Sequence, residues 1–334
     1  VGKWHLGHLP QYLPTRHGFD RYFGLPYSND MLKPDLPLMR NEEVIERNPD
    51  QSNLTERYTE EAIRFLKETC EAKDAKRPFF LYLAYTYPHV PLHSRAPFAG
   101  KSARGLFGDV VETIDWSAGR ILDALRQLGA DKDTLVVFSS DNGPWLIMRE
   151  NGGSAGPLRD GKGTTWEGGM REPCIAWWPG KIKPAGVNQS IASTMDLFTT
   201  CLTLAGAQVP KDRPIDGIDL TPVLLEGKEL RDRTLFYYAG EELRAIRKGP
   251  WKLHVKTSHA NAGTWQTRGD AEVGVPTKPG ARTFRNVSGP KLYHLEHDPA
   301  EAFGLAEKHP QVVADLLKEI DKHKAEMKPG PPQR

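Results

Sequence analysis

The sequence has little of what would place it in several common protein classes. It contains only three cysteines in 334 residues, Cys70, Cys174 and Cys201. Their spacing matches no zinc or redox motif, and three cysteines are too few to cross-link a fold of this size. No stretch approaches the roughly 18 consecutive apolar residues that a membrane-spanning helix needs. A disulfide scaffold and a membrane span are therefore both excluded.

An excess of charge of one sign is also lacking. Lys and Arg number 45 and Asp and Glu number 43, which gives a net charge of +2. No block of like charge is present, so neither a nucleic-acid partner nor an anionic membrane has electrostatic support. The 38% of apolar residues is typical of a globular protein with a core. The length allows one large domain, or a domain with a subdomain.

The first two thirds of the chain alternates between helical and strand patterns. Apolar residues at helical spacing predict three helices, over residues 54–72, 107–129 and 193–205. Continuous apolar runs predict three strands buried on both faces, over residues 79–85, 134–139 and 174–178. Strands that alternate with helices indicate an α/β domain built on a mostly parallel sheet.

The pattern changes near residue 233. Short strand patterns follow over residues 235–239, 243–247, 251–255 and 291–295, with a long polar stretch over 257–289 and an amphipathic helical pattern over 310–327. We therefore expect an α/β core over residues 1–232 and a small antiparallel sheet with a helix over residues 233–334.

Polar side chains follow two of the predicted strands, where open α/β sheets bind ligands. His89, held between Pro88 and Pro91, could act as a general acid or base, although a lone histidine is more often structural. Asp141 and Asn142 could present hard oxygen ligands to Ca²⁺ or Mg²⁺, although Asp-Asn-Gly-Pro is also an ordinary turn sequence.

Two further segments could bind an anion. The glycine-rich loop over residues 161–169 could hold a tetrahedral oxyanion with its backbone N–H groups and Lys162, or it could be an ordinary flexible loop. It lacks the spacing of a Walker P-loop. Lys3 and His5 would lie on one face of an extended segment. A cation beside a proton carrier suits the transfer of an anionic group.

Together these motifs occur in one order that is specific to a family. Gly-Lys-Trp-His-Leu-Gly, Pro-Tyr-Ser-Asn-Asp, Pro-His-Val-Pro, Ser-Asp-Asn-Gly-Pro and Gly-Lys-Gly-Thr-Thr-Trp-Glu-Gly-Gly-Met-Arg-Glu-Pro follow one another along the chain. The sequence resembles the type I formylglycine-dependent sulfatases, of the arylsulfatase A and N-acetylgalactosamine-6-sulfatase branch, over nearly its whole length. The resemblance implies an alkaline-phosphatase-like α/β/α sandwich with a small C-terminal antiparallel sheet plus helix.

The resemblance also implies roles for individual residues. The family's nucleophile is a formylglycine made from Cys or Ser in a Cys/Ser-x-Pro-x-Arg motif, and its metal is Ca²⁺, with Mg²⁺ less expected. By position in the motifs, the catalytic residues would be Lys3, His5 and His89, the substrate-binding residues Lys162, Ser28 and, more weakly, His259, and the metal ligands Asp141 and Asn142. Arg171 is interpreted as structural.

The sequence departs from the family in one respect. No Cys or Ser has the x-Pro-x-Arg context, and the family's Asp-Asp pair is absent. We expect both before Val1, together with any signal peptide. The 334-residue chain alone is therefore expected to show no sulfatase turnover and to bind Ca²⁺ poorly.

The substrate would be a sulfate ester of a small molecule or glycan, which the sequence does not identify further, and it leaves the oligomeric state open. The family suggests export to the periplasm or medium in a bacterium, and lysosomal or secreted location in an animal.

Two alternatives remain open. A phosphonate or phosphodiester hydrolase of the same superfamily could use a similar metal and nucleophile, and relative turnover of sulfate and phosphate esters would distinguish it. A non-catalytic sulfated-glycan-binding relative would lack the nucleophile altogether. The presence of both His5 and His89 argues against simple binding, which needs no pair of proton carriers.

Overall fold

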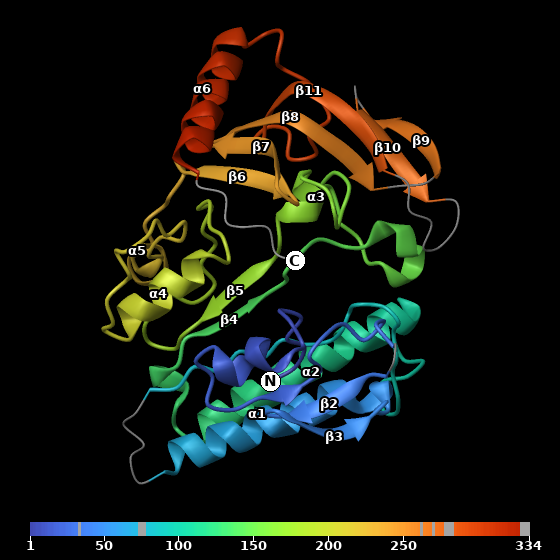
Figure 1. Ribbon diagram of the computed structural model, residues 1–334, viewed down its shortest axis with the longest axis vertical. Helices are drawn as coiled ribbons and strands as arrows, with labels where there is room; N and C mark the ends of the chain where they lie inside the picture. The colour runs from blue at the N-terminus through green and yellow to red at the C-terminus, as the bar shows by residue number, and fades with distance from the viewer. Residues whose placement is uncertain (33–34, 73–77, 261–262, 269–270, 277–283, 328–334) are drawn as a thin grey trace. The chain divides into compact units, whose positions relative to one another are not determined.

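The computed structural model covers residues 1–334 and describes all of them except 33–34, 73–77, 261–262, 269–270, 277–283 and 328–334 (Figure 1). Side chains are not described for residues 259–288. Unit 1, the first of two compact units, comprises Val1–Val136, Glu150–Gly152 and Trp178–Gly180. Unit 2 comprises Val137–Arg149, Gly153–Trp177 and Lys181–Arg334. The expected domain boundary between residues 232 and 233 falls inside unit 2 and stays a prediction.

Two helices that contact each other form much of unit 1. Helix α1 spans Leu54–Cys70 and α2 spans Gly105–Gln127, which confirms both predictions from apolar spacing. Helix α1 buries one stripe of side chains four residues apart, Leu54, Tyr58, Ala62 and Leu66. This spacing places them on one face of a helix, so the stripe packs inward while the charged residues between them face outward.

Short elements make up the remainder of unit 1. Strands β1 (Phe23–Gly24), β2 (Pro37–Arg40) and β3 (Glu43–Arg47) form an antiparallel sheet in that order. The 3₁₀ helices η1 (Pro10–Tyr12), η2 (Pro14–Arg16), η3 (Gln51–Asn53) and η4 (Asp131–Asp133) lie in the intervening segments. A further 3₁₀ segment, η5 (Leu146–Asn151), begins in unit 2 and ends in unit 1.

The strand predicted over residues 79–85 is wrong. This segment forms only an isolated parallel bridge between Ala84 and Gly2, and Phe80 and Tyr82 are 62% and 50% exposed. Continuous apolar sequence produces a doubly buried strand only where other elements cover both faces. Val1–Lys3 pairs with the backbone of this run through the carbonyl of Tyr82 and both backbone groups of Ala84.

Strands β4 (Val136–Ser139) and β5 (Cys174–Trp177) are present where the sequence predicted them and form a two-stranded sheet. Their predicted burial is wrong, because Phe138 is 42% and Ile175 is 63% exposed. The apolar runs therefore predicted the strands correctly but not the environment of their faces.

The part of unit 2 before the C-terminal sheet contains α3 (Glu167–Met170), α4 (Asp196–Leu204) and α5 (Thr221–Glu226). Helix α4 confirms the prediction over residues 193–205. Its first residue, Asp196, is fully buried and pairs with Arg233, whose Nη2 lies 2.6 Å from Oδ1. The same carboxylate accepts the backbone N–H groups of Ser193 and Ile218. One buried side chain thus ties the helix to two other segments of unit 2.

The C-terminal part of unit 2 is an antiparallel sheet with a helix on it, as predicted (Figure 1). Its strands are β6 (Thr234–Ala239), β7 (Glu242–Lys248), β8 (Trp251–Ala260) and β11 (Phe284–His294), in the order β11-β8-β7-β6. Helix α6 (Pro310–Glu326) packs on the sheet. The buried side chains between them are Leu243, Ile246, Leu253, Leu292, Leu316 and Ile320.

Much of the polar stretch over residues 257–289 is strand, which its composition did not indicate. Strand β8 extends to Ala260, and β9 (Gly263–Arg268) pairs with β10 (Ala271–Pro276) in an antiparallel hairpin. The ladder of such a ribbon uses backbone groups that are independent of side-chain polarity. A prediction based on apolar alternation therefore misses it. No described helix is long and apolar enough to span a bilayer.

Candidate active site

The segment that carries Lys3 and His5 is held between two other segments of unit 1. The N–H of Lys3 donates to the carbonyl of Ala84 at 2.7 Å, and the N–H of Gly2 donates to the carbonyl of Phe23 at 2.8 Å. A Cβ on Gly2 would lie 1.9 Å from the Ala84 carbonyl oxygen. Only glycine permits this approach, so the backbone that presents Lys3 is fixed from both sides.

His5 ends this extended geometry. Its φ is 55°, in the left-handed region, while its N–H donates to the carbonyl of Pro26 at 3.1 Å. A non-glycine residue in this region is strained by roughly 1–3 kcal/mol, and such residues gather at functional sites. The strand-like alternation that would place Lys3 and His5 on one face therefore does not apply at His5.

Ser28 and His89, 61 residues apart in sequence, meet in unit 1. Ser28 Oγ lies 3.4 Å from His89 Nδ1, which is also 2.6 Å from the carbonyl oxygen of Val90. Because a carbonyl can only accept, Nδ1 carries the hydrogen and donates it, and the lone pair of the neutral ring is on Nε2. His89 is thus oriented to exchange a proton at Nε2.

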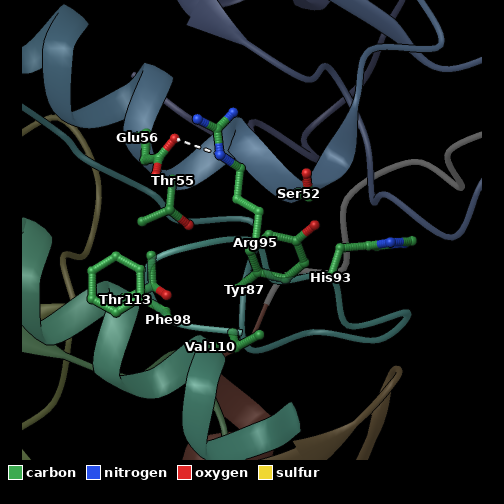
Figure 2. Close-up of a pocket in the computed structure, with 9 residues that line it drawn as sticks. All are labelled: Ser52, Thr55, Glu56, Tyr87, His93, Arg95, Phe98, Val110 and Thr113. Atoms are coloured by element: carbon green, nitrogen blue, oxygen red, sulfur yellow. Dashed lines mark ion pairs between the residues drawn. The ribbon is translucent and has the colours of Figure 1, made fainter. Parts of the chain in front are cut away.

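Residues close to His89 in the sequence help to line a small cavity (Figure 2). Tyr87 and Arg95 are among its lining residues, and Arg95 Nε lies 3.3 Å from Glu56 Oε2. Its volume of about 10 Å³ is enough for roughly one water molecule. The cavity is therefore too small to hold a substrate.

In unit 2, the segment over residues 141–144 lies against residues 159–169, which comprise the glycine-rich loop over 161–169 and the two residues before it. The N–H of Lys162 donates to the carbonyl of Pro144 at 2.9 Å. A Cβ on Gly143 would lie 1.9 Å from a carbonyl oxygen of the loop, so a larger residue cannot occupy this position without displacing it. The expected metal ligands and the expected anion-binding lysine are thus on adjoining segments.

Lys162 lies at the accessible tip of an otherwise buried loop. The residues from Thr164 to Gly169 are all buried, whereas Lys162 is half-buried and Gly163 is exposed. Lys162 Nζ lies 5.4 Å from the centroid of the Trp145 ring, in a cation–π arrangement that orients the ammonium group. The loop therefore presents one positive charge from a fixed base.

The residues around Asp141 fit a hard divalent cation. Burial, and then the negative charge of Asp141, raise the pKa of Glu172 to about 7. Glu172 Oε1 is buried with no hydrogen-bond partner, an arrangement that a cation would relieve. Asn142 Nδ2 donates to the carbonyl of Gly143 at 3.2 Å, so Oδ1 is the atom that could bind a metal.

Fewer metal ligands converge here than a complete site requires. Within the described ranges, no three or more His, Cys, Asp or Glu side chains come together in a way that could hold a metal ion. Asp141 and Asn142 therefore offer two of the oxygen ligands that a calcium ion would need, and the expected calcium site stays a prediction.

His259 lies in strand β8, where its backbone pairs with that of Arg285. Its side chain is outside the described part of the structure, so its expected contact with substrate stays a prediction.

The sequence analysis missed a buried polar cluster beneath the glycine-rich loop. Its members are Glu167 in α3, Lys252 and His254 in β8, and Glu301. The sequence predicts a short strand over residues 251–255 but not the burial of its polar side chains. Lys252 and His254 lie on this strand and are fully buried. Two ionisable residues two apart on a strand were the only available signal.

Family models cover most of the chain. The model described as sulfatase matches residues 1–207, and that for the C-terminal region of aryl-sulfatase matches residues 230–334. The chain belongs to the sulfatase family. A model for the C-terminal part of N-sulphoglucosamine sulphohydrolase also matches residues 161–259.

Curated sulfatases match over the whole chain. It is 42% identical to N-acetylgalactosamine-6-sulfatase of Mus musculus, in an alignment that covers 100% of this chain and 67% of that one. It is 36% identical to arylsulfatase A of Homo sapiens, with coverage of 98% and 68%. The predicted family is thereby confirmed.

Solved structures agree on the fold. The PsFucS1 sulfatase from Pseudoalteromonas sp. aligns with a TM-score of 0.79 at 27% identity, covering 97% of this chain and 69% of that one. Ps i-CgsB, solved in complex with k-i-k-neocarrahexaose, aligns with a TM-score of 0.73 at 26% identity and covers 96% and 70%. A phosphonate monoester hydrolase from Silicibacter pomeroyi shares the fold at a TM-score of 0.54 and 17% identity, over 83% and 60%. The predicted alkaline-phosphatase-like α/β class is confirmed.

Proposed function

We propose that this sulfatase hydrolyses a sulfate ester, with a formylglycine nucleophile supplied from outside these 334 residues and with bound calcium. The observation that carries the proposal is the contact between the loop of Lys162 and the segment of Asp141 and Asn142. A cation-binding segment joined to a fixed lysine suits a sulfuryl group, whose oxygens gain negative charge in the transition state.

The side chains of this chain have separate tasks in the proposal. Lys162 binds the sulfuryl oxygens and neutralises their charge, and Lys3 helps to hold the formylglycine or the sulfate. His89 keeps its hydrogen on Nδ1, and in its imidazolium form it donates the Nε2 proton to the leaving alcohol oxygen and is left neutral with its lone pair on Nε2. Ser28 hydrogen-bonds beside it. His5 exchanges a proton in the later step that releases sulfate.

Formylglycine and a calcium ion would supply the remaining chemistry. Formylglycine would supply a nucleophile for covalent catalysis, and Ca²⁺ would supply positive charge near the sulfuryl group. Asp141 and Asn142 would bind the calcium ion through carboxylate and amide oxygens. The raised pKa and the orphaned carboxyl oxygen of Glu172 support a cation at this place, because a bound cation would favour the ionised carboxylate.

A sulfated glycan is the substrate class that the comparisons support best. The N-acetylgalactosamine-6-sulfatase of mouse is more similar to this chain than human arylsulfatase A, and one structural neighbour is solved with a carrahexaose. We propose that a 6-sulfated N-acetylhexosamine is turned over faster than an aryl sulfate. Export or lysosomal location, as expected from the family, belongs to the same proposal.

The test of the site is the rate of sulfate release by the full-length protein and its Lys162→Ala variant. Loss of one preorganised cation should lower kcat/KM about 100-fold or more. Lys181→Ala, an exposed lysine of unit 2, is the matched control and should be unchanged. Equal rates for the wild-type protein and Lys162→Ala would contradict the assigned role.

The phosphorus alternative has one specific support, the shared fold of the phosphonate monoester hydrolase. Turnover of nitrophenyl phosphonate or phosphodiester substrates that exceeds turnover of nitrophenyl sulfate would favour it. A protein that binds a sulfated glycan without any turnover would favour the non-catalytic alternative.

A further inference from the structure

The glycine-rich loop that carries Lys162 rests on a buried group of charged side chains. We infer that Glu167, Lys252, His254 and Glu301 act as positioning residues that hold this loop, and with it Lys162, in place for sulfate binding. The inference deepens the proposed function and rests on the role proposed there for Lys162.

The first contact joins the loop to strand β8. Lys252 Nζ lies 2.8 Å from Glu167 Oε1 and 3.4 Å from Glu301 Oε1, and all three side chains are buried. Arg247 Nη1 lies 3.6 Å from Glu167 Oε2. Burial alone would lower the pKa of Lys252, but the negative charges of Glu167 and Glu301 outweigh it and raise that pKa. Lys252 is therefore a charged anchor beneath the loop.

The second contact fixes the main chain of the loop. Glu301 Oε2 accepts the backbone N–H of Glu167 at 2.6 Å, and Glu301 Oε1 lies 2.7 Å from His254 Nε2. Because a carboxylate only accepts, Nε2 of His254 carries the hydrogen, and Nδ1 can accept one from Thr165 Oγ1 at 3.4 Å. One carboxylate thus holds the start of α3 and the histidine that faces the neighbouring loop residue.

The other arm of the loop is held by the same region. Arg159 Nη1 donates to the carbonyl of Glu301 at 2.7 Å, and its guanidinium carbon lies 3.6 Å from the Trp166 ring centroid. The Trp166 ring is 4.3 Å from that of His254. Both arms therefore meet the cluster, and they also meet each other, since the N–H of Gly168 donates to the carbonyl of Arg159 at 2.8 Å.

Stability alone does not require so many buried charges. Replacing a buried ion pair by apolar residues of similar size is often neutral or stabilising, whereas directional contacts fix one geometry. Here the directional contacts converge on the segment from Thr165 to Glu167, three to five residues from Lys162. A shift of Glu167 would therefore move the tip of the loop.

The test removes both charges of one pair and follows the loop and the ligand separately. The variant is Glu167→Gln with Lys252→Met in the full-length protein. The control is Lys248→Met with Glu319→Gln, which neutralises a partly exposed pair, 2.6 Å apart, between strand β7 and helix α6. Hydrogen exchange of residues 159–169 and calorimetric binding of inorganic sulfate are measured for each.

We expect faster exchange in residues 159–169 and about tenfold weaker sulfate binding, equivalent to about 1.4 kcal/mol, in the test variant only. Lys162→Ala should weaken sulfate binding without faster exchange. Wild-type exchange and affinity in a folded test variant would overturn the inference. If Lys162→Ala binds sulfate normally, the proposed function itself fails.

A milder variant decides the matter if the double variant does not fold. Glu167→Asp keeps the charge but shortens the side chain by one methylene, which withdraws the carboxylate from Lys252. We expect a folded protein with a faster-exchanging loop and weaker sulfate binding. Unchanged exchange and affinity in Glu167→Asp would overturn the inference.

Discussion

Glu301 should make a pH-dependent contribution to stability that can be worked out from its surroundings. Burial would raise its pKa, but the charge of Lys252 and the hydrogen bonds from His254 and the Glu167 N–H outweigh burial and lower that pKa from 4.5 to about 2. At 1.36 kcal/mol for each pKa unit, the ionised carboxylate contributes about 3 kcal/mol to the free energy of unfolding. Because the folded-state pKa is depressed, this contribution is present above pH 4.5 and is lost as the pH falls towards 2.

The variant Glu301→Gln separates the contribution of Glu301 to stability from the contributions of the other carboxylates. Urea unfolding should show the variant less stable than the wild-type protein by about 3 kcal/mol at pH 7, with the difference shrinking as the pH falls below 4.5. Glu319→Gln removes a carboxylate that pairs with Lys248 near the surface and should change stability by less than about 1 kcal/mol. A difference between Glu301→Gln and wild type that stays constant from pH 7 to 3 would refute the reasoning.

Three further predictions concern other buried groups. Burial, with the charges of Lys252 and Arg159, lowers the pKa of His254. The neutral histidine therefore stabilises the fold above the usual histidine pKa, and this stabilisation is lost as the pH falls below that value. NMR titration should find a pKa for His254 below the usual value. Arg233→Met leaves the buried Asp196 without its ion pair and should reduce the free energy of unfolding by about 3–5 kcal/mol in urea titrations. Gly143→Ala should lower the melting temperature, because the added Cβ would lie 1.9 Å from a loop carbonyl oxygen. Gly119→Ala in α2, which has open space around it, should raise the melting temperature through about 0.5–1 kcal/mol of helix propensity. Equal melting temperatures for the two glycine variants would contradict the close approach.

Apolar spacing predicted the helices well because a single buried stripe defines an amphipathic helix. Helices α1, α2 and α6 each begin and end within a few residues of their predicted bounds. The strand over 79–85 failed for a different reason. A strand exists through its partners, and an apolar run does not say which segments will pair with it. The hairpin of β9 and β10 was missed because backbone pairing leaves no apolar pattern to detect.

The sequence indicated the candidate site residues because their side-chain types and their order along the chain match the motifs of the family. Ser28 and His89 come together in unit 1, and the Lys162 loop lies on the segment of Asp141 in unit 2. The supporting cluster could not be found in this way. Lys252 and Glu301 are 49 positions apart, and nothing in either local sequence indicates that they share a buried environment; only the tertiary fold provides each with its opposite charge.

The central claim is that the segments of Lys162 and Asp141 serve the hydrolysis of a sulfate ester. The most direct measurement is sulfate release from a 6-sulfated N-acetylhexosamine by the full-length protein in calcium, compared with Lys162→Ala and Asp141→Ala. The account predicts multiple turnover by the wild-type protein and a loss of about 100-fold or more in each variant. Turnover that is the same in all three proteins, or no turnover of any sulfate ester by the wild-type protein, would contradict it.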